Sequence, residues 1–274
     1  MDFREKMKTF SFNLQIGFNL PFLTIIFFLI MFSSFVYCLE IKITRTNGQE
    51  EKGILEKMGD DGSITLKVQS GTVTLRRDQY LKVVSAETPS EITLAQQNFN
   101  NKKYADALKN YQTAYEKYKW LNWGETALEG IGNCHRALGE NEKAIESYET
   151  FIKQFPRSGA INRVKYSIGL TYRTMGKKEE SLKAFNEVID ATDDVVTAFS
   201  LVNAGDIYFE KGEYEKALRS YLKVIILYET LKGAASKVRE AKTGAGKCYD
   251  KIIENTSSQQ ERTVLQSEKE RITR

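Results

Sequence analysis

Residues 204–221 read AGDIYFEKGEYEKALRSY, and a phrase with the same spacing recurs over about residues 91–251. Each copy begins with a small residue beside an apolar one. These small residues are Ala95, Gly132, Gly169, Gly205 and Gly246, so successive copies lie 37, 37, 36 and 41 residues apart. A period in this range is typical of stacked repeat units, and this repeat decides the fold.

Each spaced position of the quoted copy has a physical reason. Gly205 lets a second helix approach the first closely, and Gly212 ends the first helix at a position where a positive φ is inexpensive. Ala217 is the close-contact point on the second helix. Tyr221, four residues later, lies on the same face and fills the gap to the next pair. Neither helix buries its apolar face alone, so we expect the helix pairs to stack into an α-solenoid.

The phrase resembles the tetratricopeptide repeat over about residues 91–251. Its pattern is met most fully by Gly205, Tyr208, Gly212, Tyr214, Ala217 and Tyr221. The resemblance implies a mostly α chain with about four helix pairs plus a capping pair. The departures from the pattern are Asn98, His135, Ser181 and the lack of a Gly seven residues after Gly246.

The repeat length and one connecting segment point to a particular group of tetratricopeptide proteins. The spacings of 36 and 37 residues, together with Phe155-Pro156-Arg157-Ser158, resemble the tetratricopeptide variety found in bacterial cell-envelope proteins. The end of the chain reads Ser258-Gln259-Gln260-Glu261, a capping box that predicts one more helix. Few large apolar residues follow it, as expected for a C-terminal capping helix that faces water.

The composition excludes several classes of protein. Lys and Arg total 40 against 36 Asp and Glu, so the formal net charge is +4, which argues against a nucleic-acid partner. Three Cys and one His are too few for a disulfide scaffold or a cluster of metal ligands. Gly and Pro together number 21, which favours a mostly helical chain.

The first 38 residues predict an export segment. Arg4, Lys6 and Lys8 precede a nearly continuous apolar run over residues 20–32. This run fits a cleaved signal peptide, an uncleaved membrane anchor over residues 20–38, or a lipoprotein modified at Cys38. An N-terminal hydrophobic helix is therefore expected, and in all three cases export places the rest of the chain outside the cytosol, in the periplasm or cell envelope.

Residues 39–86 predict a small all-β module. Apolar residues alternate with polar ones from Leu39 to Ile43 and again from Ile64 to Val68, and tight-turn residues separate five short strands. Five strands of this length favour a closed five-stranded barrel. The strand spacing resembles the SH3-like and Sm-like small barrels, and we expect a structural role for the module more than a ligand site. Residues 87–274 then form the solenoid with its capping helix.

No arrangement of catalytic residues is recognisable, so we expect no enzyme, no cofactor and no small-molecule substrate. Gly244-Ala245-Gly246-Lys247 lacks the earlier Gly and the following Ser or Thr of a phosphate loop. His135 falls at a buried aromatic position of the repeat and is expected to pack structurally. Cys134 and Cys248 occupy equivalent places three repeats apart, so we expect two buried thiols and no disulfide.

The resemblance implies a binding groove lined by the first helix of each pair. Helical phase predicts that the groove presents aromatic, Arg and acidic side chains. The candidate peptide-binding residues are Glu129, Asn133 and Arg136, then Arg163, Tyr166, Leu170 and Arg173, then Phe199, Val202, Asp206 and Phe209. Aromatic and Arg residues are typical interface anchors, and Arg binds carboxylates bidentately, so a carboxylate-bearing protein or peptide partner is expected. Trp120 and Trp123, in the link between the first and second pairs, are expected to pack across the joint between repeats, with a surface anchor as the alternative.

Together these features predict a non-enzymatic protein–protein interaction scaffold of the cell envelope. One alternative is a membrane-anchored assembly factor whose β-module and solenoid jointly hold an envelope complex. A second alternative is a hydrolase with a site in the cleft between the β-barrel and the solenoid, for which the sequence offers no nucleophile–base pair.

Overall fold

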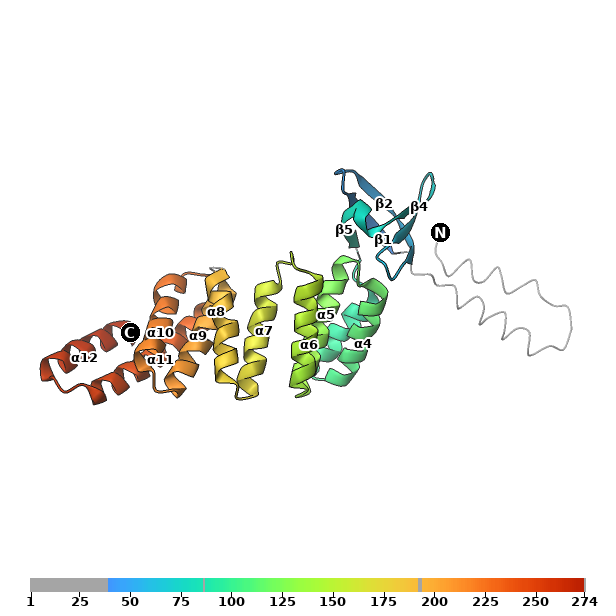
Figure 1. Cartoon of the computed structure of the whole chain (residues 1–274). Helices are drawn as coiled ribbons and strands as arrows, with labels where there is room; N and C mark the ends of the chain where they lie inside the picture. The colour runs from blue at the N-terminus through green and yellow to red at the C-terminus, as the bar shows by residue number, and fades with distance from the viewer. Residues whose placement is uncertain (1–38, 86, 192–193, 274) are drawn as a thin grey trace, which may run out of the picture.

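The computed structural model describes residues 39–85, 87–191 and 194–273. A small β-sheet stands at one end of a row of antiparallel helices (Figure 1). The predicted export segment lies outside the described residues, and among the described residues no helix combines the length and apolarity that a membrane span requires.

The β-module is one antiparallel sheet of five strands in the order β4-β3-β2-β1-β5. The strands are β1 (Glu40–Arg45), β2 (Glu50–Met58), β3 (Ile64–Val68), β4 (Gly71–Leu75) and β5 (Tyr80–Ser85), with a short 3₁₀ helix, η1 (Arg77–Gln79), before the last. Strand β2 pairs with β1 through its first half and with β3 through its second half, and the register shifts between Leu55 and Lys57. Such a bulge bends the strand. In the described residues the ladder has β4 and β5 at its two ends, so closure into a barrel stays a prediction.

Ten helices of the described chain follow as five antiparallel pairs, as the repeat predicted. They are α3 (Ser90–Asn100), α4 (Tyr104–Tyr118), α5 (Asn122–Ala137), α6 (Asn141–Gln154), α7 (Ile161–Thr174), α8 (Lys178–Ala191), α9 (Val195–Glu210), α10 (Tyr214–Tyr228), α11 (Ala235–Asn255) and α12 (Gln259–Thr273). The last pair confirms that the capping segment is helical. Helix α12 buries none of its side chains fully, in keeping with a solvated end.

Glycine–aromatic contacts join the two helices of three pairs: α5 with α6, α7 with α8, and α9 with α10. A Cβ on Gly169 would lie 2.5 Å from the Phe185 ring, and a Cβ on Gly205 would lie 2.8 Å from the Tyr221 ring. Because real Cβ atoms do not approach this closely, only glycine allows the second helix to seat its aromatic ring there. The small residue and the aromatic ring predicted from the repeat are therefore in direct contact.

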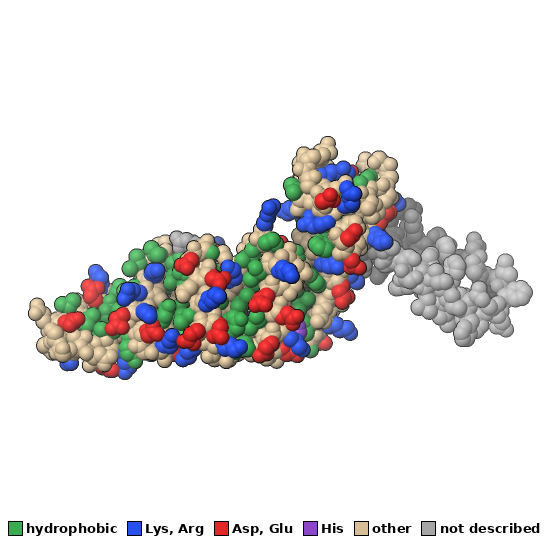
Figure 2. Space-filling model, in the orientation of Figure 1, with side chains coloured by type: hydrophobic (Ala, Val, Ile, Leu, Met, Phe, Trp, Pro, Cys, Tyr) green, Lys and Arg blue, Asp and Glu red, His purple; other side chains and the backbone are tan. Residues whose placement is uncertain are grey.

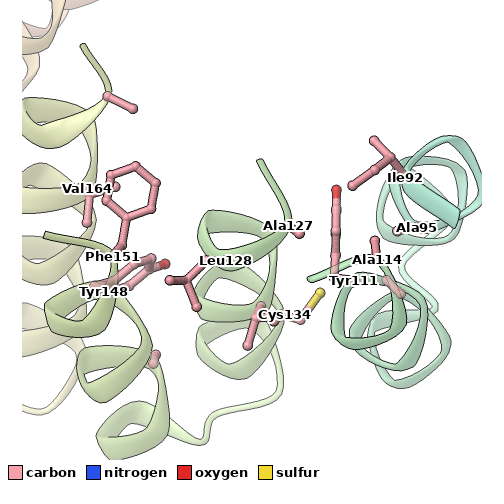
Figure 3. Close-up of a cluster of buried hydrophobic side chains, with 14 of the residues drawn as sticks. Ile92, Ala95, Tyr111, Ala114, Ala127, Leu128, Cys134, Tyr148, Phe151 and Val164 are labelled. Atoms are coloured by element: carbon pink, nitrogen blue, oxygen red, sulfur yellow. The ribbon is translucent and has the colours of Figure 1, made fainter. Parts of the chain in front are cut away.

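The core continues from pair to pair. Tyr111 of α4 lies between Ile92 of α3 and Ala127 of α5, and Tyr148 and Phe151 of α6 pack toward Val164 of α7 (Figure 3). Ile92, Ala127, Tyr148, Phe151 and Val164 have no measurable exposure, and Tyr111 is 6% exposed. The second helix of each pair thus fills the gap to the next pair.

The two predicted buried thiols and the predicted structural histidine are found as expected. Cys134 and Cys248 are buried and free. Burial raises the pKa of each thiol to about 12. His135 is also buried, and its Nδ1 lies 2.6 Å from a carboxylate oxygen of Glu140, across the turn between α5 and α6.

The turn between α4 and α5 joins the helices to the sheet. Leu121 is buried in the core of the sheet, beside Ile43 and Leu66. Asn122 Oδ1 accepts a hydrogen bond of 3.0 Å from the backbone N–H of Ser85, and Lys119 pairs with Asp60 at 2.9 Å. The sheet is therefore completed by a residue of the helical domain.

The tryptophans flank this joint, and for Trp123 the predicted packing between repeats is confirmed, with the sheet as an added contact. Trp123 packs against both the core of the sheet and the core of the first helix pairs. Trp120 faces cations instead, with the guanidinium of Arg77 5.9 Å and the ammonium of Lys119 5.8 Å from its ring centroid. The difference arises because Leu121, between them, is drawn into the sheet.

Candidate functional site

The first helices of successive pairs form one row. Helix α3 contacts α5, α5 contacts α7, α7 contacts α9, and α9 contacts α11, whereas successive second helices of the described chain make no comparable contacts. We call the solvent side of the row α5, α7, α9 and α11 the inner face. The eleven groove residues predicted from the sequence all lie on α5, α7 and α9 of this row.

The inner face is held together by ion pairs between neighbouring repeats. Arg163 of α7 donates two hydrogen bonds to the carboxylate of Glu129 on α5, at 2.6 and 2.7 Å. This bidentate pairing raises the pKa of Arg163. Two residues predicted separately as partner-binding thus bind each other.

Arg173 of α7 makes a larger network with α9. Its guanidinium donates to Asn203 Oδ1 at 2.7 Å, Asp206 Oδ2 at 3.1 Å and Glu210 Oε1 at 3.2 Å. Glu210 also pairs with Lys178 at 3.0 Å, and the hydrogen bond from Lys178, followed by the one from Arg173, holds the pKa of Glu210 below its usual range. Arg163 and Arg173 are therefore already paired with carboxylates within the chain, and their binding of a partner's carboxylate stays a prediction.

Tyrosine hydroxyls on the second helices donate hydrogen bonds to polar side chains of this row of first helices. Tyr148 donates to Asn133 Oδ1 at 2.7 Å, and Tyr221 donates to Asp206 Oδ1 at 2.7 Å. Burial, and then the hydrogen bond to Asp206, raise the pKa of the Tyr221 hydroxyl. Asn133 and Asp206 are therefore oriented by the second helices behind them.

Aromatic side chains cross the middle of the inner face. The Tyr166 ring lies 5.7 Å from that of Phe185 and 6.1 Å from that of Phe199, measured between centroids. Lys237 of α11 places its ammonium 5.3 Å from the Phe199 ring centroid. Tyr166, Phe199 and Phe209 are half-buried and so keep part of each ring available to a partner, whereas Val202, predicted in the same set, is buried.

A hollow of about 370 Å³ opens between α7, α9 and α11. Its walls include the predicted Arg173, Asp206 and Phe209. They also include residues of α11 that the sequence reasoning missed, namely Glu240, Thr243 and Lys247. They could have been predicted from the spacing of 41 residues between Gly205 and Gly246. Adding 41 to the numbers of Phe199, Val202 and Asp206 gives Glu240, Thr243 and Lys247.

The cleft between the sheet and the helices, considered for a hydrolase, is a second hollow of about 520 Å³. Its lining includes the carboxylate of Glu91. Burial alone would raise the pKa of Glu91, but hydrogen bonds from Lys117, its own backbone and Ser90 outweigh burial and hold that pKa below its usual range. A general acid needs the opposite shift. Among the described residues, no group of three or more His, Cys, Asp and Glu side chains is placed to hold a metal ion.

The charged side chains of both signs are interspersed along the helices. Figure 2 shows this for one face of the molecule, where Lys and Arg alternate with Asp and Glu and no broad region of a single sign is visible. Interspersed charges of both signs keep this face well solvated.

Comparison with known proteins identifies the helical repeat unit. A family model described as "Tetratricopeptide repeat" matches residues 126–158, and a second model of the same description matches residues 163–194 and 200–230. A curated human protein, "Intraflagellar transport protein 88 homolog", is 25% identical over 134 residues, which are 48% of this chain and 16% of the human protein. This chain therefore spans under a fifth of that relative.

Solved structures share the fold at low sequence identity. BtubC (BKLC) from P. vanneervenii superposes with a TM-score of 0.53 at 15% identity, covering 66% of this chain and 78% of that one. A MamA structure from Desulfovibrio magneticus RS-1 gives a TM-score of 0.47 at 13% identity, covering 68% of this chain and 95% of that one. The first likeness supports a helical repeat fold and nothing finer.

Proposed function

We propose that this chain, which carries tetratricopeptide repeats, acts as a non-enzymatic scaffold that holds a segment of another protein on its inner face. Tetratricopeptide proteins generally act in protein–protein interaction. The observation that carries the proposal is the strip of half-buried aromatic rings, Tyr166, Phe199 and Phe209, set on the same face as the Glu129–Arg163 and Arg173–Asp206 ion pairs. Half-buried aromatic side chains on a rigid face are typical anchors for a partner.

The preformed ion pairs support a rigid binding surface. Glu129 with Arg163, and Arg173 with Asp206, fix side chains that would otherwise lose rotamer entropy when a partner binds. The inner face is thereby preorganised, and the aromatic contacts supply the binding energy.

Site-specific photo-crosslinking in intact cells tests the proposal. A photoreactive amino acid is placed at Phe209 on the inner face, or at the exposed Lys153 on α6 as a control. We expect a discrete crosslinked protein from position 209 and none from position 153. We also expect Arg163→Glu to reduce the crosslink at position 209 and Lys153→Glu, a charge-matched change, to leave it. Equal crosslinking from both positions, or none from position 209, would contradict inner-face binding.

We further propose that the scaffold works outside the cytosol, in the periplasm or cell envelope. The support is the basic start and apolar run of the first 38 residues. Fractionation of cells, with N-terminal sequencing of the mature chain, tests this. A chain that begins at Leu39 indicates a cleaved signal, and a chain recovered in the cytosolic fraction with Met1 or Asp2 at its start would refute export.

The membrane-anchored assembly factor is the second candidate, favoured by the joint between sheet and helices. Leu121 in the sheet core and the Ser85–Asn122 hydrogen bond give the two modules one fixed arrangement, which suits joint contact with a single complex. Retention of residues 20–38 in the mature, membrane-bound chain distinguishes this candidate. In that case crosslinks are expected from the sheet as well as from Phe209.

A further inference from the structure

Two hollows adjoin at the C-terminal end of the inner face. The first is the 370 Å³ hollow between α7, α9 and α11, and the second, of about 560 Å³, lies between α11 and α12. Thr243 and Lys247 line both. We call them the apolar hollow and the basic hollow, for the reasons below.

The apolar hollow has an uncharged floor and a neutralised wall. Val202, Phe209 and Tyr221 line it, and Gly244 adds no side chain. Each of its carboxylates has a cation partner within the chain: Asp206 and Glu210 pair with Arg173, and Glu240 pairs with Lys237 at 2.6 Å. An apolar side chain can therefore enter this hollow without stripping water from an unpaired carboxylate.

The basic hollow has an excess of cations. Arg239, Lys242, Lys247 and Lys269 line it, against the single carboxylate of Asp250. Lys269 is paired with Asp250 at 2.5 Å, and Lys242 lies 3.6 Å from Glu229. Over residues 39–85, 87–191 and 194–273, neither Arg239 nor Lys247 has a carboxylate within ion-pair distance.

The repeat register shows that this positive charge is particular to the last unit. The positions equivalent to Lys247 in the three preceding units are Asn133, Leu170 and Asp206. Those equivalent to Arg239 are Glu125, Asn162 and Ala198. At these two positions of the inner row only α11 carries cations, directly beside the apolar hollow.

We propose that the partner segment carries an apolar side chain, which enters the apolar hollow, and next to it one or more Asp or Glu side chains, which pair with Lys247 and Arg239. This inference rests on the proposed inner-face scaffold and specifies the chemistry of its partner. The cations of the basic hollow favour Asp or Glu in the partner segment, because the charges are complementary. Val202, Phe209 and Tyr221 of the apolar hollow favour an apolar side chain beside them. On binding, the partner's carboxylate gains an ion pair with Lys247 or Arg239, and the existing ion pairs of Asp206, Glu210 and Glu240 stay intact.

Peptide selection tests this chemistry even while the partner is unidentified. The probe is a random 12-residue peptide library displayed on phage and selected on the immobilised full chain. We expect enrichment of sequences with Leu, Ile or Phe within a few residues of Asp or Glu. Selected peptides are then labelled with fluorescein and titrated by fluorescence anisotropy against the variants.

Two kinds of variant separate the parts of the site. Lys247→Glu combined with Arg239→Glu reverses the charge of the basic hollow and is expected to weaken the acidic peptides by about tenfold or more, or about 1.4 kcal/mol per tenfold step. Thr243→Phe, at an exposed position shared by the two hollows, adds bulk without changing charge and is expected to weaken the same peptides. Lys153→Glu combined with Lys223→Glu makes the same charge change at exposed positions of α6 and α10 and is expected to have no such effect. Circular dichroism melting verifies that each variant is folded.

The outcomes distinguish this inference from the function on which it rests. If peptides bind the full chain but their affinity is unchanged in the charge-reversed and Thr243→Phe variants, the assigned site is wrong while inner-face scaffolding stands. If no peptide is enriched, both fail. If a 12-nucleotide single-stranded DNA binds as tightly as the acidic peptides and is lost in the same variants, the basic hollow is a general anion site and the peptide assignment is overturned.

Discussion

Tyr221 donates its hydroxyl hydrogen bond to Oδ1 of Asp206 at 2.7 Å, fifteen residues earlier on the partner helix of its own pair. The equivalent bond two units earlier joins Tyr148 to Asn133, also at 2.7 Å. The unit between them has Phe185 and Leu170 at these positions, so the hydroxyl and its acceptor are absent together. These three pairs are therefore each matched in polarity across their two helices.

Removing one hydroxyl tests this matching. We expect Tyr221→Phe to lower the free energy of unfolding by about 1 kcal/mol, because Asp206 loses a hydrogen bond that water replaces only in part. Phe185→Tyr is the converse change: it places a hydroxyl opposite Leu170 in a site with no exposure and is expected to destabilise by about 1–3 kcal/mol. Urea unfolding followed by circular dichroism measures both. A neutral Phe185→Tyr would show that the pairs are not matched.

Lys102 occupies a backbone conformation that the other units give to glycine. Its φ is +60°, and the equivalent Gly139, Gly176 and Gly212 have φ of +79°, +74° and +78°. The hydrogen bonds are also equivalent, from Lys102 N to Phe99 O and from Lys103 N to Asn98 O, as from Gly212 N to Phe209 O and from Glu213 N to Tyr208 O. A lysine at positive φ costs free energy that glycine avoids.

We therefore expect Lys102→Gly to stabilise the chain by about 0.5–1 kcal/mol, since part of the gain is offset by the greater freedom of glycine in the unfolded state. The reverse change, Gly212→Lys, is expected to destabilise by about 1 kcal/mol. No atom lies within 4 Å of a Cβ at Gly212, so this cost is one of backbone conformation alone. Thermal and urea unfolding of both variants measure the difference. A destabilised Lys102→Gly would mean that the Lys102 side chain contributes more than its strained backbone costs.

The glycine–aromatic contact predicts a compensating pair of substitutions. Gly169→Ala places a Cβ 2.5 Å from the Phe185 ring, which is fully buried and cannot swing away. We expect a loss of about 1–3 kcal/mol, despite the better helix propensity of alanine. Adding Phe185→Leu to Gly169→Ala makes room for the methyl group, so the double variant should lose less than the sum of the two single variants. Strict additivity in urea unfolding would argue against the contact.

The buried thiols predict a loss of stability in alkali. The folded-state pKa of Cys134 and of Cys248 is raised from 9.0 to about 12 by burial, so only the unfolded chain releases these protons between those values. Their contribution is complete below pH 9 and is lost as the pH rises toward 12, by up to about 1.4 kcal/mol per pH unit for each thiol.

Unfolding free energies at pH 8 and pH 10 measure this loss, and Cys134→Ala with Cys248→Ala is the control. The doubly substituted chain should fall less between the two pH values, while the buried tyrosines titrate alike in both proteins. In a Cys38→Ser background, both remaining thiols should react with a thiol reagent at pH 8 only after unfolding. Rapid reaction in the folded chain would contradict their burial.

The repeat was predictable because its determinants are local. Gly205, Gly212 and Tyr221 each act within one helix pair, and their spacing repeats along the chain. The last pair was harder, because the spacing lengthens to 41 residues and Lys247 and Glu240 fall outside the shorter register. The resemblance to the tetratricopeptide repeat implied a groove on the first helices, and helical phase gave its residues, but neither could show which of its charges are paired within the chain.

The pairings themselves depend on tertiary geometry. Arg163 and Glu129 are 34 residues apart, and helical phase places both on one face without stating that they meet. The joint between sheet and helices is equally non-local, since Leu121 fills a core made by residues 41–83. Nothing in the alternation of the strands marks that core as incomplete.

The incomplete sheet has a consequence for the order in which this protein is made. Ribosomes release the strands of residues 40–85 first, yet the core of the sheet lacks Leu121 until the turn after α4 has also been released. The module nearest the N-terminus is thus finished only after the first helix pair and the start of the second have emerged. During synthesis or export, the first part of the described chain to appear is therefore among the later parts to reach its final packing.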